Sequence, residues 1–236
     1  MPAERLLEIT VESLDTALAA ERGGADRLEL CAELTNGGVT PPIATVRKIH
    51  EEVEIPLFAI IRPRAGNFVY SDSEFAAMLR SIATVRDLAL DGVALGILEA
   101  DGTVDIERTR ELVEAARPLE VTFHRAFDHT PDLVRALDDV VETGATRILT
   151  SGGAAGAPEG VDVLRKLVSA AGDRIVIVPG AGLHSGNIAK VASETRAKEF
   201  HSGLGTVLPY GSTNLTKFES EIHVMKRCLD PHSLTP

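Results

Sequence analysis

Three carboxylates and one imidazole in this sequence are candidates for acid/base catalysis. Glu8 and Glu29 each lie within a short aliphatic run, and a His-Arg-Ala-Phe-Asp segment runs from His124 to Asp128. Two carboxyls held close together in a poorly hydrated space separate their pKa values, which leaves one of them protonated near neutral pH. An imidazole titrates in the same range. We therefore treat Glu8, Glu29, His124 and Asp128 as catalytic candidates, with a hydrogen-bonded core histidine as the alternative reading of His124.

A second group of residues suits the binding of a small anion. Arg62 and Arg64 flank Pro63, and two guanidiniums near one rim favour a carboxylate or phosphate. Glycine-rich turns expose backbone N–H groups that can hold the same anion. The other predicted substrate-binding residues are Arg125, Ser151, Gly152, Gly153, Gly180, Gly182, His201 and Ser202. The alternative is that these glycines only allow the chain to turn sharply.

The two cysteines limit the metal and disulfide chemistry. Cys31 and Cys228 are widely separated and there is no Cys-x-x-Cys spacing, so a disulfide framework is excluded as the source of stability. A soft Cu(I) site needs clustered thiolates or thioethers, and the whole chain has 2 Cys and 3 Met. Cys31 taken alone reads as a small buried apolar residue.

Eight repeats of an apolar run followed by a helix-like stretch organise these residues. The apolar runs begin near Leu6, Arg27, Pro56, Gly92, Leu119, Arg147, Ile175 and Glu199. This alternation predicts a single (β/α)8 TIM barrel over residues 1–236, with residues 228–236 as a frayed tail. Barrels of this kind build their sites at the C-terminal ends of the strands. The competing fold, a doubly wound sheet, normally has a glycine-rich loop after its first strand, and the segment from Thr10 to Leu14 has no glycine.

The alternation of side chains along each strand predicts which of them point into the barrel. The outer face of a barrel strand is apolar because helices cover it. If Leu7 and Ile9 face the helices, then Glu8 faces inward. The same reasoning predicts interior or mouth positions for Glu29, Arg62, Thr122, His124 and His201. We expect Glu8, Glu29 and Arg62 to meet at close range, either as an acid/base site or as a satisfied ionic plug.

Composition narrows the classes of partner. The net charge is −11, and no cluster of Lys and Arg with interleaved aromatic residues offsets it, so nucleic acid is not an expected partner. No apolar run approaches the length that spans a bilayer, and the first residues lack the features of a secretory signal. We expect a cytoplasmic protein that does not enter membranes.

Several segments together resemble the CutC family of copper homeostasis proteins. They are Leu28-Glu-Leu-Cys31, Gly37-Gly-Val-Thr-Pro41, Ile61-Arg-Pro-Arg64, Val121-Thr-Phe-His-Arg-Ala-Phe-Asp128, Leu149-Thr-Ser-Gly-Gly153 and Gly180-Ala-Gly182. The resemblance spans roughly residues 5 to 205. It implies a cytosolic barrel that forms a homodimer or a larger homo-oligomer and handles copper. It also implies Cu(I) binding through a cysteine, a role that maps here only onto Cys31.

Two functional hypotheses follow from different features. The resemblance and Cys31 favour a protein that binds Cu(I). The polar residues at the predicted mouth favour an enzyme that acts by acid/base chemistry on a small phosphorylated or carboxylated metabolite. The residues by themselves specify no cofactor, reaction or substrate, and they leave open whether Glu29 or His124 carries the proton.

Overall fold

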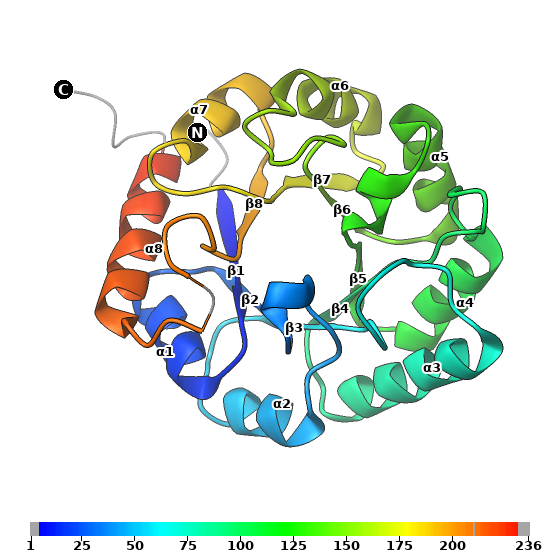
Figure 1. The fold of residues 1–236 in the computed structure, drawn as a ribbon, viewed down its shortest axis with the longest axis horizontal. Helices are drawn as coiled ribbons and strands as arrows, with labels where there is room; N and C mark the ends of the chain where they lie inside the picture. Colours follow the sequence, from blue (N-terminus) through cyan, green and yellow to red (C-terminus); the bar gives the residue numbers. More distant parts are fainter. Residues whose placement is uncertain (1–4, 210, 231–236) are drawn as a thin grey trace.

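The barrel predicted from the sequence is present. The computed structural model describes residues 5–209 and 211–230, in which eight parallel strands form a ring inside a layer of helices (Figure 1). The strands are β1 (Leu6–Val11), β2 (Arg27–Leu30), β3 (Leu57–Ile60), β4 (Gly92–Leu95), β5 (Glu120–Phe123), β6 (Arg147–Thr150), β7 (Val176–Pro179) and β8 (Glu199–Ser202). Their hydrogen-bonded order is β7-β6-β5-β4-β3-β2-β1-β8, and β7 also contacts β8. This nearly closed, singly wound sheet excludes the doubly wound alternative.

A helix follows each strand, because a parallel connection has to return to the opposite end of the sheet. The helices are α1 (Leu14–Arg22), α2 (Ile43–His50), α3 (Asp72–Asp87), α4 (Ile106–Ala116), α5 (Leu133–Thr143), α6 (Val161–Ala171), α7 (Ile188–Thr195) and α8 (Leu215–Leu229). Two short 3-10 helices, η1 (Leu34–Asn36) and η2 (Arg125–His129), lie in the loops after β2 and β5. Cys228 is still helical, so the predicted start of a frayed tail at residue 228 is wrong; residues 231–236 lie outside the described part.

The predicted alternation of side chains is confirmed. Leu7 and Ile9 of β1 belong to the main apolar core between the strands and the helices. The neighbouring Glu8 points into the barrel, where it meets charged residues of other strands. A smaller apolar cluster of Cys31, Ile60 and Ala94 lies inside the barrel. The interior is thus divided between a few apolar residues and many polar ones, which concentrates ionisable groups along the barrel axis.

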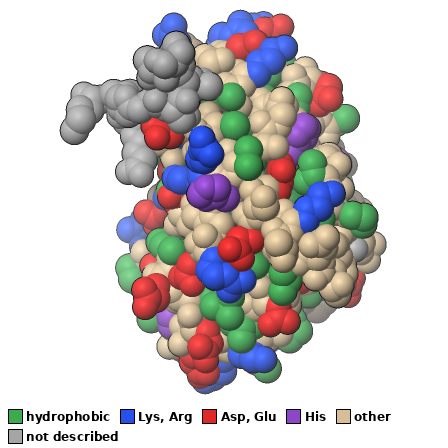
Figure 2. Space-filling model, turned by 90° about the vertical axis from the view of Figure 1, so that its left-hand side faces the viewer, with side chains coloured by type: hydrophobic (Ala, Val, Ile, Leu, Met, Phe, Trp, Pro, Cys, Tyr) green, Lys and Arg blue, Asp and Glu red, His purple; other side chains and the backbone are tan. Residues whose placement is uncertain are grey.

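The outer surface near α8 carries charges of both signs. Acidic and basic side chains are interspersed on this face, with small separate apolar areas between them (Figure 2). Such a surface resembles the solvated exterior of ordinary globular domains. Among the described residues, no helix is long and apolar enough to cross a lipid bilayer.

Candidate active site at the barrel mouth

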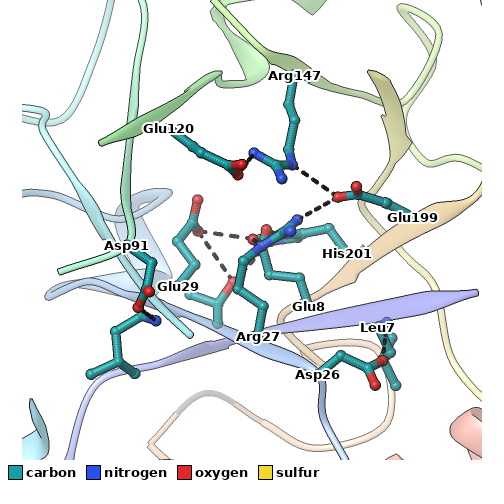
Figure 3. A network of polar contacts seen from close by, with 12 residues as sticks. Leu7, Glu8, Asp26, Arg27, Glu29, Asp91, Glu120, Arg147, Glu199 and His201 are labelled. Atoms are coloured by element: carbon teal, nitrogen blue, oxygen red, sulfur yellow. Dashed lines mark hydrogen bonds and ion pairs between the residues drawn. The ribbon is translucent and has the colours of Figure 1, made fainter. Parts of the chain in front are cut away.

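The lower half of the barrel interior is occupied by a chain of ion pairs that we call the basal network: Glu8, Arg27, Glu120, Arg147 and Glu199 (Figure 3). Arg27 pairs with Glu8 and, at 2.8 Å, with Glu199. Arg147 pairs with Glu120 and, at 3.0 Å, with the same Glu199 oxygen. The Phe58 ring lies against both guanidiniums, 4.8 Å from that of Arg27 and 5.3 Å from that of Arg147. An ionic plug therefore exists, as the sequence suggested, but its central cation is Arg27 and not Arg62.

Of the trio expected from the sequence, Glu8 and Glu29 come within 4.8 Å of each other beside His201, but Arg62 does not join them. Arg62 lies beyond the end of β3, at the mouth, whereas Glu8 lies in the middle of β1. The two terminal nitrogens of Arg62 donate to the backbone oxygens of Asn36, Gly38 and Gly66. Arg27 lies two residues before Glu29, so both side chains are on the inward face of β2. Arg27 was not predicted because it is the first residue of its strand. The same holds for Arg147 and Glu199.

Above the basal network, one hydrogen-bonded chain connects Glu8 to Glu29 through His201 and Thr10. His201 Nδ1 lies 2.6 Å from Glu8 Oε1, and His201 Nε2 lies 2.8 Å from Thr10 Oγ1. The Thr10 hydroxyl donates to Glu29 Oε2 at 3.4 Å, so it accepts from His201. His201 Nε2 is also 3.8 Å from Glu29 Oε2. Because Nδ1 faces a carboxylate and Nε2 faces an acceptor, the arrangement suits an imidazolium that donates from both nitrogens.

The pKa values of Glu8 and Glu29 are shifted in opposite directions, although both side chains are buried. Burial raises the pKa of Glu8, but Arg27 and His201 outweigh it and hold this pKa at about 2. Burial raises the pKa of Glu29 to about 7, and the charge of His201 only partly offsets this. For His201, burial lowers the pKa, and the charges of Glu29 and Glu8 reverse the effect and raise it. Glu29 can therefore gain or lose a proton near neutral pH, while Glu8 holds His201 in place as a permanent anion.

A cavity of about 420 Å³ opens above this chain, at the C-terminal ends of the strands. Its wall brings together the predicted site residues Glu29, Arg62, His124, Arg125, Gly182, His201 and Ser202. Thr10 and Phe68 also line it but were not among the predicted site residues, although strand alternation predicts that Thr10 faces inward. Thr10 has the same alternation as Glu8, which was the available signal for it. Phe68 lies on the loop after β3, where no periodicity identifies the side chains that line the cavity.

His124 and Arg62 both pack against the Phe68 ring. The ring centroids of His124 and Phe68 are 5.0 Å apart, and the Arg62 guanidinium lies 4.8 Å from the Phe68 centroid. Burial, followed by the charge of Arg62, lowers the pKa of His124 to about 3. At neutral pH, His124 is thus an uncharged imidazole, which makes Glu29 rather than His124 the group suited to carry a proton.

The backbone N–H groups of the glycine-rich loop after β6 bind the side-chain carboxylate of Asp128. The Asp128 carboxylate accepts hydrogen bonds from the backbone N–H groups of Ser151 and Gly153, at 3.0 and 3.1 Å. It also accepts from the Ser151 hydroxyl and, at 2.8 Å, from Arg125 Nε. The backbone N–H of Gly152 is occupied by the Thr150 hydroxyl. Asp128 was expected to act on a substrate, and Gly152 and Gly153 to bind one; this geometry instead gives Asp128 the role of ordering the loop.

The loops after β7 and β8 contribute glycines to the cavity wall. Gly182, Gly203 and Gly205 line it, and no acceptor for their N–H groups is found within the described part of the chain. Gly180 lies deeper, and an added Cβ there would stand 2.4 Å from the Leu149 side chain. Gly180 is therefore needed for close packing between β6 and β7, while Gly182 lies in the cavity wall.

Arg64 differs from the expectation that two guanidiniums share one rim. It does not line the cavity. Its Nε donates to Glu74 at 2.6 Å, and its terminal nitrogens donate to oxygens of Ala65, Asn67 and Val69. Arg64 thus fixes the loop before α3, and Arg125 is the second arginine of the cavity wall.

The surroundings of Cys31 do not match a Cu(I) site. Its side chain is 1% exposed and packs with Ile60, Ala94 and Leu34. Burial and the charge of Glu29 raise the pKa of its thiol, so the thiolate form is disfavoured. The other cysteine, Cys228, lies on α8 beside the carbonyl oxygen of Ser185. No second sulfur is placed near Cys31 among the described residues.

Comparison with known proteins identifies close relatives. The family model described as the CutC family matches residues 5–206. A CutC family protein of Chromobacterium violaceum is 48% identical over 199 residues, which are 84% of this chain and 81% of that protein. A CutC family protein of Salmonella schwarzengrund is 44% identical over 204 residues, 86% of this chain and 82% of that protein.

Solved structures agree with these matches. The structure of a Streptococcus agalactiae CutC protein, named for copper homeostasis, has a TM-score of 0.80 and 34% identity and covers 84% of this chain and 98% of its own. Phosphoribosyl anthranilate isomerase of Thermotoga maritima has a TM-score of 0.63 at 15% identity, covering 95% of this chain and 98% of its own. At that identity the likeness concerns the fold alone.

Proposed function

This chain belongs to the CutC family, and from that premise we propose that it is an enzyme that moves a proton on a small phosphorylated or carboxylated metabolite at the barrel mouth. The observation that carries the proposal is the position of Glu29. It is a buried carboxyl in the cavity wall, connected through Thr10 to His201, and its pKa is about 7. A carboxyl of this kind is partly protonated at physiological pH and can both accept and donate a proton, whereas an ordinary surface glutamate is almost fully ionised there.

The cavity also has the donors that an anionic group needs. Arg62 and Arg125 bring positive charge to the wall of a protein whose net charge is −11. The unoccupied N–H groups of Gly182, Gly203 and Gly205 lie at the ends of β7 and β8, where barrels of this class commonly hold a phosphate. A carboxylate or phosphate anchored there would place the rest of a small molecule toward Glu29.

A thermal-shift screen of anionic metabolites tests this proposal. A ligand present at about 100 times its Kd should raise the Tm of the wild type by roughly 5–10 °C. The Arg125→Gln variant should lose most of that increase. Arg64→Gln is the matched control, because Arg64 and Arg125 are similarly exposed, at 38% and 41%, and each pairs with a carboxylate. If no anion stabilises the wild type, or if Arg125→Gln responds as fully as the control, the proposal fails.

Copper handling is the second candidate function, and it is favoured by the family to which the chain belongs. The donor set around Cys31 does not fit this role, since a soft Cu(I) ion prefers two or more sulfur ligands. Anaerobic Cu(I) titration decides between the two readings. A stoichiometric site that is lost in Cys31→Ser and retained in the matched control Cys228→Ser would support copper binding. Equal weak binding by all three proteins would refute it.

We further propose that the protein works in the cytoplasm as a homodimer or larger homo-oligomer, as its family resemblance implies. Sedimentation equilibrium of the full chain measures this assembly directly. A mass of about 25 kDa at micromolar concentration, equal to the 25.1 kDa chain, would contradict it.

A further inference from the structure

His124 has an unused hydrogen-bond donor in the wall of the cavity. The residue follows β5, is 5% exposed and lines the cavity. Its Nδ1 accepts a hydrogen bond from the backbone N–H of Ala126 at 3.2 Å. Because a neutral imidazole carries one proton, an acceptor at Nδ1 places that proton on Nε2. The backbone of η2 therefore selects the tautomer.

The Nε2 atom of His124 is buried, and none of the described residues provides it with a partner. Arg62, which packs against the same Phe68 ring, differs in this respect, because its side chain interacts with the buried hydroxyl of Tyr70. Buried donors in folded proteins are normally hydrogen-bonded, so an unpartnered donor in a cavity wall indicates that a ligand atom or a water completes the site. His124 Nε2 is a donor, so an acceptor such as an oxygen is the atom that completes the site.

The surroundings keep His124 uncharged. Burial disfavours the imidazolium, and the charges of Arg62 and His129 act in the same direction. Phe68 packs against both histidine rings, at 5.0 Å from His124 and 5.2 Å from His129. A neutral imidazole donates a hydrogen bond without giving up its proton, which suits the stabilisation of an oxygen that becomes negative during a reaction.

We infer that the substrate is a small carbonyl compound with an anionic group, whose carbonyl oxygen accepts a hydrogen bond from His124 Nε2 while Glu29 removes a proton from the adjacent carbon. This inference rests on the proposed function and specifies its substrate class. The Glu29 carboxylate takes the proton, the C–H electron pair becomes a C=C bond, and the carbonyl π electrons move to the oxygen. Return of a proton from Glu29 to carbon reverses this enolisation and regenerates the carbonyl compound, with no oxidant or cofactor required.

Hydrogen exchange in D2O tests the reaction. The wild type is incubated with dihydroxyacetone phosphate, pyruvate and 2-oxoglutarate, and loss of the C–H signal next to the carbonyl is followed by proton NMR. Glycerol 3-phosphate and lactate, which lack that carbonyl, are the matched compounds and should not exchange. For a compound that exchanges, Glu29→Gln should abolish the reaction and His124→Leu should slow it about a hundredfold. His124→Gln, which keeps an N–H donor, should recover part of the rate.

The outcomes separate this inference from the proposed function. If anions stabilise the wild type but no carbonyl compound exchanges, the substrate class is wrong and the anion site stands. If exchange depends on Glu29 and is equal in His124→Leu and wild type, the role of His124 is wrong. If neither stabilisation nor exchange is found, both proposals fail.

A second measurement needs no variant and no ligand. The 15N chemical shifts of the His124 ring in the wild type should show a neutral imidazole with its proton on Nε2 between about pH 5 and pH 8. A proton on Nδ1, or an imidazolium at about pH 6, would overturn the inference even if every His124 variant failed to fold.

Discussion

Glu8 and Glu29 are buried carboxyls on adjacent strands with different chemical roles. Glu8 pairs with Arg27 and His201, and these contacts make its negative charge permanent. Glu29 accepts a long hydrogen bond from the Thr10 hydroxyl, and the more distant cations His201 and Arg27 add to the stabilisation of its anion. The protein thus keeps one poorly stabilised carboxyl next to its cavity. Such a group lowers the stability of the fold and is retained where chemistry needs it.

Replacing this carboxyl should increase stability at alkaline pH. Glu29 has an ordinary pKa of 4.5 and a folded pKa of about 7, so its stabilising contribution is complete below pH 4.5 and is lost as the pH rises through 7. Glu29→Gln lacks that loss. The difference in free energy of unfolding between Glu29→Gln and the wild type should therefore grow in favour of the variant by roughly 1–3 kcal/mol as the pH rises from about 4 to about 8. Urea unfolding at both pH values measures this, and a difference that does not change with pH would contradict the raised pKa.

At the scale of elements, η2 and the loop after β6 are held together by Asp128. Its side chain is 5% exposed and accepts from Arg125, Thr150, Ser151 and Gly153. The loop is glycine-rich, with positive φ at Gly152 and Gly153, so it has little order of its own. By fixing this loop, Asp128 also fixes Arg125 in the cavity wall.

Removal of Asp128 should therefore weaken the fold rather than only the chemistry. Asp128→Ala leaves several buried donors unpaired, and we expect a loss of about 2–4 kcal/mol in the free energy of unfolding. The matched control is Asp132→Ala, which removes the N-cap of α5 and should cost about 1 kcal/mol. Urea unfolding gives both values. A stable Asp128→Asn variant that had lost proton exchange would instead support a direct catalytic role for Asp128.

At the scale of the whole molecule, the basal network divides the barrel into two halves. Its ion pairs lie among the N-terminal parts of the strands, while the cavity lies at their C-terminal ends. Strands β1, β2, β6 and β8 and the first residue of β5 all contribute to it, so it joins segments that are far apart in the sequence. The network leaves the C-terminal mouth as the side from which a ligand reaches Glu29.

Breaking the basal network should destabilise the entire barrel. Arg27→Met leaves Glu8 and Glu199 buried with fewer cationic partners, and we expect a loss of about 3–5 kcal/mol. The matched control is Arg22→Met, which breaks a pair with Glu219 whose arginine is 55% exposed and should cost no more than about 1 kcal/mol. Thermal unfolding of both variants checks this, and equal losses would show that burial does not control the strength of these pairs.

The sequence by itself determined the barrel and the inward positions of its polar residues. Strand alternation depends only on the geometry of neighbouring residues, so an apolar Leu7 and Ile9 already require Glu8 to face the interior. The same local rule identified Glu29, His124 and His201, which the structure brings to the barrel interior and its mouth.

The tertiary structure alone decided which partner each charged group meets. Arg62 and Arg64 are two residues apart, yet one lines the cavity and the other pairs with Glu74 on the outside of a loop. Asp128 occupies the glycine loop that was expected to bind an external anion. The partner that each of these side chains meets depends on the paths of the loops and on strands that are distant in the sequence. Because a charge is governed by whichever opposite charge comes closest in three dimensions, no local pattern determines it.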